Sequence, residues 1–136
     1  MSVIYVGCAL LHASEESKQK VANFKKTLKD QGQTVLEFVT NPNATNEEVY
    51  SNDIIECVGK CDLMIAFVDL PSTGLGFEMA SALFRFKKPV IAVCHRDNGA
   101  KVSRLIKGIG GEMGPELFQF HTYEDMDSVA DLVAKI

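Results

Sequence analysis

The stretch that decides the fold is "DLMIAFVDLPSTGLGFEMASA", residues 62 to 82. Its first part, residues 62–68, is a continuous apolar strand of the kind found in parallel sheets covered by helices on both faces. A turn with two glycines follows, and the pattern then predicts a helix from about Gly74 to Lys87. The lone acid Glu78 falls in the first turn of that helix.

The same alternation of strand and helix runs along the whole chain. Strands are predicted over residues 2–7, 33–39, 62–68, 89–93 and 116–123, and helices over residues 14–31, 45–60, 74–87, 102–107 and 125–136. Such alternation, with right-handed crossovers, predicts a parallel sheet covered on both faces. We expect one α/β domain over residues 1–136, a flavodoxin-like (Rossmann-like) three-layer sandwich with strand order 2-1-3-4-5. Residues 108–115 are expected to form a mobile loop.

Composition excludes several classes of protein. The net charge is −4, whereas a nucleic-acid surface needs clustered Lys and Arg. No apolar run approaches the roughly 20 residues of a membrane helix, and no basic leader precedes the first strand, so we expect a cytoplasmic protein. The four cysteines are expected to be reduced and packed in the core, because no Cys or His pair at zinc-site spacing accompanies them. No metal site is predicted.

Folds of this type bind ligands at the carboxyl edge of the sheet, where the strand order reverses. Here that crevice lies between the first and third strands and would be lined by residues 7–14 and 69–78. The glycine turn is not a dinucleotide motif, because Met79 replaces the third glycine and the turn follows the third strand. A P-loop is absent, and the first loop has no aromatic residue to stack on a flavin, so no cofactor is expected. Glu78 then either complements the helix dipole or acts as a nucleophile on a glycine platform.

The segment "PSTGLGFEMASA" resembles the signature of the nucleoside 2-deoxyribosyltransferase family. It is most similar to the branch of 2′-deoxynucleoside 5′-monophosphate N-glycosidases, which share the pattern P-S-x-G-x-G-[FY]-E. Three other segments agree: "IYVG" with Tyr5, "NDIIECVGKCD" with Asp53, and "VSRLIKG" with Ser103. The resemblance extends from the first strand to Gly108.

The resemblance implies cleavage of an N-glycosidic bond in a (deoxy)nucleoside or nucleoside 5′-monophosphate, by hydrolysis or base exchange. Glu78 would be the nucleophile that forms a glycosyl intermediate, Tyr5 would hold its carboxylate, and Asp53 would protonate the leaving base. Substrate contacts would come from Cys8, Leu10, Ser72, Gly74, Gly76 and Ser103. Because Ser103 would reach the pocket of a neighbouring subunit, the resemblance also implies a homodimer or higher homo-oligomer.

Two departures from the family pattern leave alternatives open. Leu11 and His12 occupy the turn where the glycosidase branch has a Gly/Arg-rich phosphate grip. Asp53 lies one residue further from the next strand than the pattern expects, and one residue turns a helical side chain by about 100°. Either the helix end adjusts so that Asp53 points inward, or Asn52 or Glu56 faces the pocket.

Other readings of the same crevice also remain. Asp69 and His95 end strands at the same edge and are weaker candidates for substrate contact. A protein that binds a nucleotide or nucleotide-sugar without turning it over is the alternative function.

Overall fold

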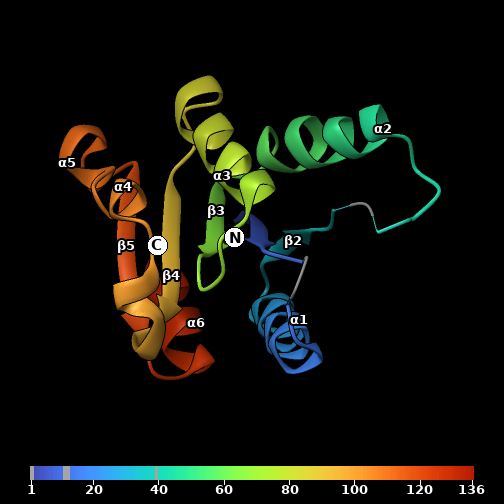
Figure 1. Ribbon diagram of the computed structural model, residues 1–136. Coiled ribbons are helices and arrows are strands. Elements are labelled where there is room, and N and C mark those ends of the chain that lie inside the picture. Colours follow the sequence, from blue (N-terminus) through green and yellow to red (C-terminus); the bar gives the residue numbers. More distant parts are fainter. Residues whose placement is uncertain (1, 11–12, 39) are drawn as a thin grey trace.

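The fold is built on one five-stranded parallel sheet with the strand order β2-β1-β3-β4-β5 (Figure 1). The computed structural model describes residues 2–10, 13–38 and 40–136. The strands are β1 (Val3–Cys8), β2 (Thr34–Leu36), β3 (Leu63–Phe67), β4 (Val90–His95) and β5 (Phe118–Tyr123). The predicted strand number, direction and order are therefore confirmed.

Helices cover both faces of the sheet. One face carries α1 (Glu15–Asp30) and α6 (Met126–Ala134), which contact each other. The other face carries α2 (Asn46–Tyr50), which continues as the π-helix η1 (Ser51–Val58), and α3 (Thr73–Ala80), which continues as the π-helix η2 (Ser81–Arg85). The short helices α4 (Arg104–Lys107) and α5 (Gly110–Met113) lie beside β5, and the 3₁₀-helix η3 (Arg96–Lys101) follows β4 (Figure 1). The sheet therefore separates two apolar cores.

The alternation of side chains along β1 decides which core each residue enters. Ile4 and Val6 pack in the core under α1 and α6, whereas Tyr5 packs in the core under η1 and α3. Gly7 faces the same side as Tyr5, because a Cβ built on it would lie beside Leu75 and Glu78. The side of β1 that carries Tyr5 and Gly7 therefore faces α3.

Polar side chains define where four of the helices begin. Ser14, Thr45, Ser72 and Asp125 each accept a hydrogen bond from the backbone N–H three residues further on. The predicted stop of α1 is also observed, because Gly32 adopts a positive φ of 90° just after the helix.

Some predicted boundaries are wrong. The second strand was expected over residues 33–39 but pairs only from Thr34 to Leu36, because it meets β1 alone, at the edge of the sheet. The backbone ladder ends at Leu36. The next residue, Glu37, points its carboxylate to α1, where it accepts hydrogen bonds from Lys25 and Lys29. Residues 110–113 of the expected loop form a helical turn, closed by the Gly114 N–H donating to Gly110 O.

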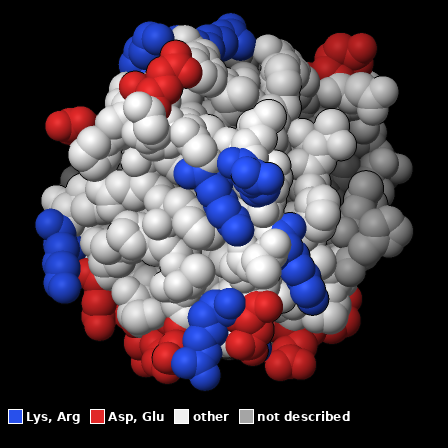
Figure 2. Space-filling view, turned by 60° about the vertical axis from the view of Figure 1, so that its left-hand side comes forward, with Lys and Arg blue, Asp and Glu red and all other residues white. Residues whose placement is uncertain are grey.

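Charges of both signs are spread over the surface. On the face in Figure 2, single Lys and Arg side chains stand on a largely uncharged surface, and Asp and Glu gather along its lower rim. That face therefore presents no continuous basic stripe. In the described part of the chain, no helix has both the length and the apolar character needed to cross a membrane.

Candidate active site

The centre of the site is a buried hydrogen bond between β1 and α3. The hydroxyl of Tyr5 donates to Oε2 of Glu78, and the two residues are only 1% and 9% exposed. Tyr5 enters this core because of its place in the strand, and Glu78 faces it from the inner side of the helix. The structure thus brings together the two residues that the sequence paired.

The position of Glu78 in its helix differs from the prediction. Ser72 caps α3 and the helix begins at Thr73, so Glu78 lies in the second turn rather than the first. The helix dipole acts mainly on the first turn. The Tyr5 hydroxyl is therefore the donor that holds this carboxylate.

The electrostatic environment of Glu78 places its titration near neutral pH. Burial raises the pKa of Glu78 to about 7, the Tyr5 hydrogen bond opposes that rise, and the charge of Asp53 adds to it. Burial and the Glu78 charge also raise the pKa of Tyr5 well above its usual range. Tyr5 therefore remains a protonated donor throughout the physiological pH range.

Gly7 makes room for this pair. A Cβ on Gly7 would lie 2.8 Å from Leu75 Cδ1, 3.0 Å from Met64 Cε and 3.6 Å from Glu78 Oε1. A side chain at Gly7 would force the ends of the Leu75 and Met64 side chains to move, and it would lie beside the Glu78 carboxylate.

Asp53 joins the pair from η1. Its Oδ1 atom is buried, and its charge raises the pKa values of Glu78, Tyr5 and Cys57. The sequence left Asn52 and Glu56 as the alternatives to Asp53. Glu56 instead pairs with Lys60 at the exposed surface, and Asn52 Oδ1 lies 4.0 Å from Cys57 Sγ.

The helix that carries Asp53 changes type in this segment. The Gly59 N–H donates to Ile54 O at 2.8 Å, five residues back rather than four. A π-turn of this kind takes up one extra residue, and such turns often occur at functional sites. The extra residue between Asp53 and β3 is therefore absorbed inside η1.

The glycine turn before Glu78 is open. A Cβ on Gly74 or on Gly76 would meet none of the described atoms within 4 Å. Packing within the described chain therefore does not require glycine at either position, although both lie within a helix, where glycine is unfavourable.

The other residues predicted to contact the substrate lie at separate places in the fold. Ser72 Oγ accepts from Leu75 N–H and so caps α3, Cys8 is half-buried at the end of β1, and Leu10 is exposed. Ser103 begins α4, with its Oγ accepting from Leu105 N–H, and α4 lies on the far side of β4 from α3 (Figure 1). A single chain thus does not bring Ser103 to Glu78. Leu11 and His12 lie outside the described residues.

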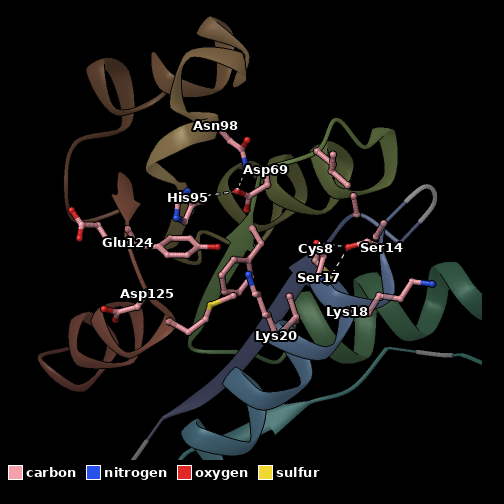
Figure 3. A pocket seen from close by; sticks show the side chains of 17 residues that line it. Cys8, Ser14, Ser17, Lys18, Lys20, Asp69, His95, Asn98, Glu124 and Asp125 are labelled. Atoms are coloured by element: carbon pink, nitrogen blue, oxygen red, sulfur yellow. Dashed lines mark hydrogen bonds between the residues drawn. The ribbon is translucent and has the colours of Figure 1, made fainter.

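A cavity of about 650 Å³ opens at the carboxyl edge of the sheet, toward α1 and α6 (Figure 3). Asp69 lies within it, and its Oδ1 accepts from His95 N–H and Asn98 Nδ2, both at 2.8 Å. The ring of Tyr123 stands edge-on to His95 at 5.8 Å between centroids. Cys8 lines this cavity and packs against the core under α1 and α6, whereas Tyr5 lies in the core on the other face of the sheet. Burial raises the pKa of the Cys8 thiol, and the Glu78 charge adds to that rise.

Asp69 and His95, which line this cavity, were predicted from the sequence as candidates for substrate contact. Asn98 and Tyr123, which also line it, were not predicted. The strand-end position of Tyr123 was a usable signal, because parallel strands end at the same edge. Asn98 follows β4 within a 3₁₀-helix that no periodicity predicted.

Metal-binding chemistry is not suggested by the described residues. No group of three or more His, Cys, Asp or Glu residues among them could hold a metal ion. Cys8, Cys57, Cys61 and Cys94 are all free thiols, and all but Cys8 are fully buried.

Comparisons with family models, with curated proteins and with solved structures relate this chain to known proteins. No protein-family model matches the chain. It is 33% identical over 124 residues to a protein of Thermofilum pendens named "Putative 2'-deoxynucleoside 5'-phosphate N-hydrolase 1", covering 84% of this chain and 82% of that protein.

Solved structures share the fold at lower identity. The CMP N-glycosidase of Clostridium botulinum superposes with a TM-score of 0.73 at 19% identity, over 98% of this chain and 99% of that one. The 2-deoxyribosyltransferase of Leishmania mexicana superposes with a TM-score of 0.68 at 14% identity, over 99% and 98% of the two chains.

Proposed function

Given that the chain belongs to the nucleoside 2-deoxyribosyltransferase-like family of N-glycosidase enzymes, we propose that it cleaves the N-glycosidic bond of a nucleoside or nucleoside 5′-monophosphate through a covalent intermediate on Glu78. The observation that carries this proposal is the buried hydrogen bond from Tyr5 to Glu78. It fixes a carboxylate of near-neutral pKa beside an open glycine turn.

In the first step, Glu78 attacks C1′ of the sugar. Tyr5 holds Oε2, so Oε1, which lies on the Gly7 side, forms the new C–O bond while the bond from C1′ to the base nitrogen breaks. The transition state has oxocarbenium character, and the carboxylate stabilises its positive charge. Asp53 in its protonated form donates the proton that the leaving base requires.

In the second step, an acceptor attacks C1′ and releases Glu78. Water gives the free sugar and completes a hydrolysis, with Asp53 accepting the proton that water loses. A second nucleobase gives a new nucleoside and completes a base exchange. Both outcomes use the same intermediate.

The sugar is placed by the open surface in front of Glu78. Gly74 and Gly76 allow its ring to lie against the helix backbone, since neither position would carry a side chain toward it. Ser72, at the start of α3, lies where it can contact the 5′ end, with Cys8 and Leu10 beside it at the end of β1.

A second copy of the chain would complete the site. An apolar surface of four side chains on α2, α3 and η2 supports this, because Val49, Tyr50, Phe77 and Phe84 are each 37–56% exposed. The rings of Tyr50 and Phe77 already pair at 6.2 Å. A homodimer through this apolar surface would cover it and place the Ser103 of one copy near the glycine turn of the other.

The proposal is tested by base release. Ribo- and deoxyribonucleosides and their 5′-monophosphates are incubated with the protein, and free base is measured by chromatography. Glu78→Ala should reduce release to background, and Glu112→Ala, which removes an exposed acid from α5, should leave it unchanged. Wild-type turnover by Glu78→Ala would refute the nucleophile assignment.

The two reactions separate in one further assay. A second free base is added with the substrate, and formation of the exchanged nucleoside identifies base exchange, whereas free sugar identifies hydrolysis. Trapping with a 2′-fluoro nucleoside should leave the sugar on the peptide that contains Glu78. Calorimetric binding without release of any base would instead support a binding protein.

A further inference from the structure

We propose that the π-turn of η1 is a positioning device, whose extra residue turns Asp53 toward Tyr5 and Glu78 and whose register is held by Gly59 against Phe86. This inference rests on the proposed roles of Asp53 and Glu78. It assigns a function to two residues, Gly59 and Phe86, that contact neither the sugar nor the base in the proposed mechanism.

The first support is the geometry of the backbone. In an α-helix the Gly59 N–H would bond to Ile55 O, whereas here it bonds to Ile54 O. Cys57 and Val58 follow Asp53 and are 2% and 0% exposed, so this end of η1 is anchored in the core. If η1 were α-helical with the same number of residues, Asp53 would turn by about 100° relative to that anchor.

The second support is the contact at the end of the π-turn. A Cβ on Gly59 would lie 2.7 Å from Ile55 O and 3.1 Å from Phe86 Cε1 and Cζ. Phe86 closes a π-turn of its own, because its N–H donates to Ser81 O, also five residues back. The two π-turns therefore meet where only a glycine fits.

The third support is the arrangement of the residues next to Asp53. The side chain of Glu56 reaches Lys60 on the surface, and Asn52 lies toward Cys57. The Oδ1 atom of Asp53 is buried, η1 packs against α3, and the Asp53 charge raises the pKa values of Glu78 and Tyr5. The π-turn thus selects one acid of this segment for the site.

The test changes the length of the segment in opposite directions. Deleting the exposed Glu56 removes the extra residue, so η1 becomes α-helical while Asp53 keeps its direction. Inserting one alanine after Glu56 adds a residue that the turn cannot absorb, so Asp53 turns away. We expect the deletion to retain activity within a few fold of wild type and the insertion to lose about 10²-fold or more, as Asp53→Asn does.

A readout independent of turnover separates this proposal from the proposed function. The pKa of the Glu78 carboxyl is followed by ¹³C NMR in each variant, and the charge of Asp53 should raise it only where Asp53 faces Glu78. The deletion should keep the wild-type pKa, and the insertion should lower it as Asp53→Asn does. If the wild type releases no base, the proposed function fails while these titrations still decide the register.

Gly59→Ala tests the register without changing the chain length. It should lower the Glu78 pKa and the activity, whereas Gly111→Ala, at an open position in α5, should change neither. A folded Glu56 deletion with the activity and Glu78 pKa of Asp53→Asn would overturn the proposal. If that deletion does not fold, an unchanged Glu78 pKa in Gly59→Ala would overturn it.

Discussion

Tyr5 and Glu78 are 73 residues apart in the chain, and the hydroxyl of one donates to the carboxylate of the other inside the core. Three influences meet at that carboxylate: burial and the Asp53 charge raise its pKa, and the Tyr5 hydrogen bond lowers it. Because the Tyr5 hydrogen bond and the Asp53 charge act with opposite signs, removing one or the other should move the pH dependence in opposite directions.

Tyr5→Phe should move the acid limb of the kcat/KM profile to higher pH. With an activated leaving group that departs without protonation, the wild-type kcat/KM should rise through about pH 7, since the nucleophile must be ionised. Loss of a hydrogen bond to a charged group, worth about 1.5–3 kcal/mol, should raise the Glu78 pKa by about 1–2 units. A pH series of kcat/KM measures this, and a limb that stays in place or moves down contradicts it.

Asp53→Asn should move the acid limb of the kcat/KM profile to lower pH. The neutral amide removes the charge that raises the Glu78 pKa. It also removes the proposed acid, so kcat should fall by about 10²–10⁴-fold with an ordinary base. The loss should be much smaller with an activated leaving group that departs without protonation. Equal losses on both substrates would exclude Asp53 as the proton donor.

Glu78→Gln should stabilise the fold at alkaline pH. The folded pKa of about 7 is raised above the ordinary glutamate pKa of 4.5, so the wild type loses stability as the pH rises from 4.5 through 7. A neutral glutamine avoids that loss, which is on the order of 3 kcal/mol. Urea unfolding should show a large advantage of the variant at pH 8 that shrinks toward pH 4.5. A constant difference across this range would argue against the raised pKa.

Gly7→Ala and Gly76→Ala should separate packing from substrate binding. The methyl group of the first would force the ends of the Leu75 and Met64 side chains to move within the core, which should lower the free energy of unfolding by about 1 kcal/mol. The methyl group of Gly76→Ala would point into open space from α3. This substitution should therefore leave the free energy of unfolding unchanged or raise it by up to about 1 kcal/mol. It should nevertheless raise KM by excluding the sugar. Unchanged KM in a stable Gly76→Ala would place the sugar elsewhere.

Phe77→Ser with Phe84→Ser should weaken self-association. Both side chains are more than half exposed on the apolar surface of α3 and η2, and burial of such rings dominates interface energetics. Sedimentation velocity should show a wild-type dimer and a monomeric double variant. An Ile136→Ser control removes an exposed apolar side chain just after α6, on the other face of the sheet, and tests whether the effect is specific to this surface. A monomeric wild type would exclude the dimer.

The fold could be predicted because its three central strands, β1, β3 and β4, are nearly uniform apolar runs and the strands alternate with amphipathic helices. The residues of β3 are all buried, as its composition predicted, and the strand order follows from right-handed crossovers. The pairing of Tyr5 with Glu78 came from the resemblance, because strand periodicity alone would give Tyr5 only a place in the core.

Other features depend on contacts that no local pattern contains. The π-turn after Asp53 has a backbone hydrogen bond from Gly59 N–H to Ile54 O, five residues back, and a Cβ on Gly59 would lie against Phe86 of another helix. The length of β2 is set by its single neighbour β1, and the cavity arises from side chains of four strand ends. Each depends on residues distant in the chain.

The burial of the four thiols has a practical consequence. Burial raises the pKa of Cys8 and Cys94, and it raises those of Cys57 and Cys61 to about 12 and about 11. Thiolate is the form that reacts with alkylating reagents and peroxide, and at neutral pH almost none is present. Cys57, Cys61 and Cys94 should therefore withstand purification in air without added reductant, and iodoacetamide should label them only after unfolding.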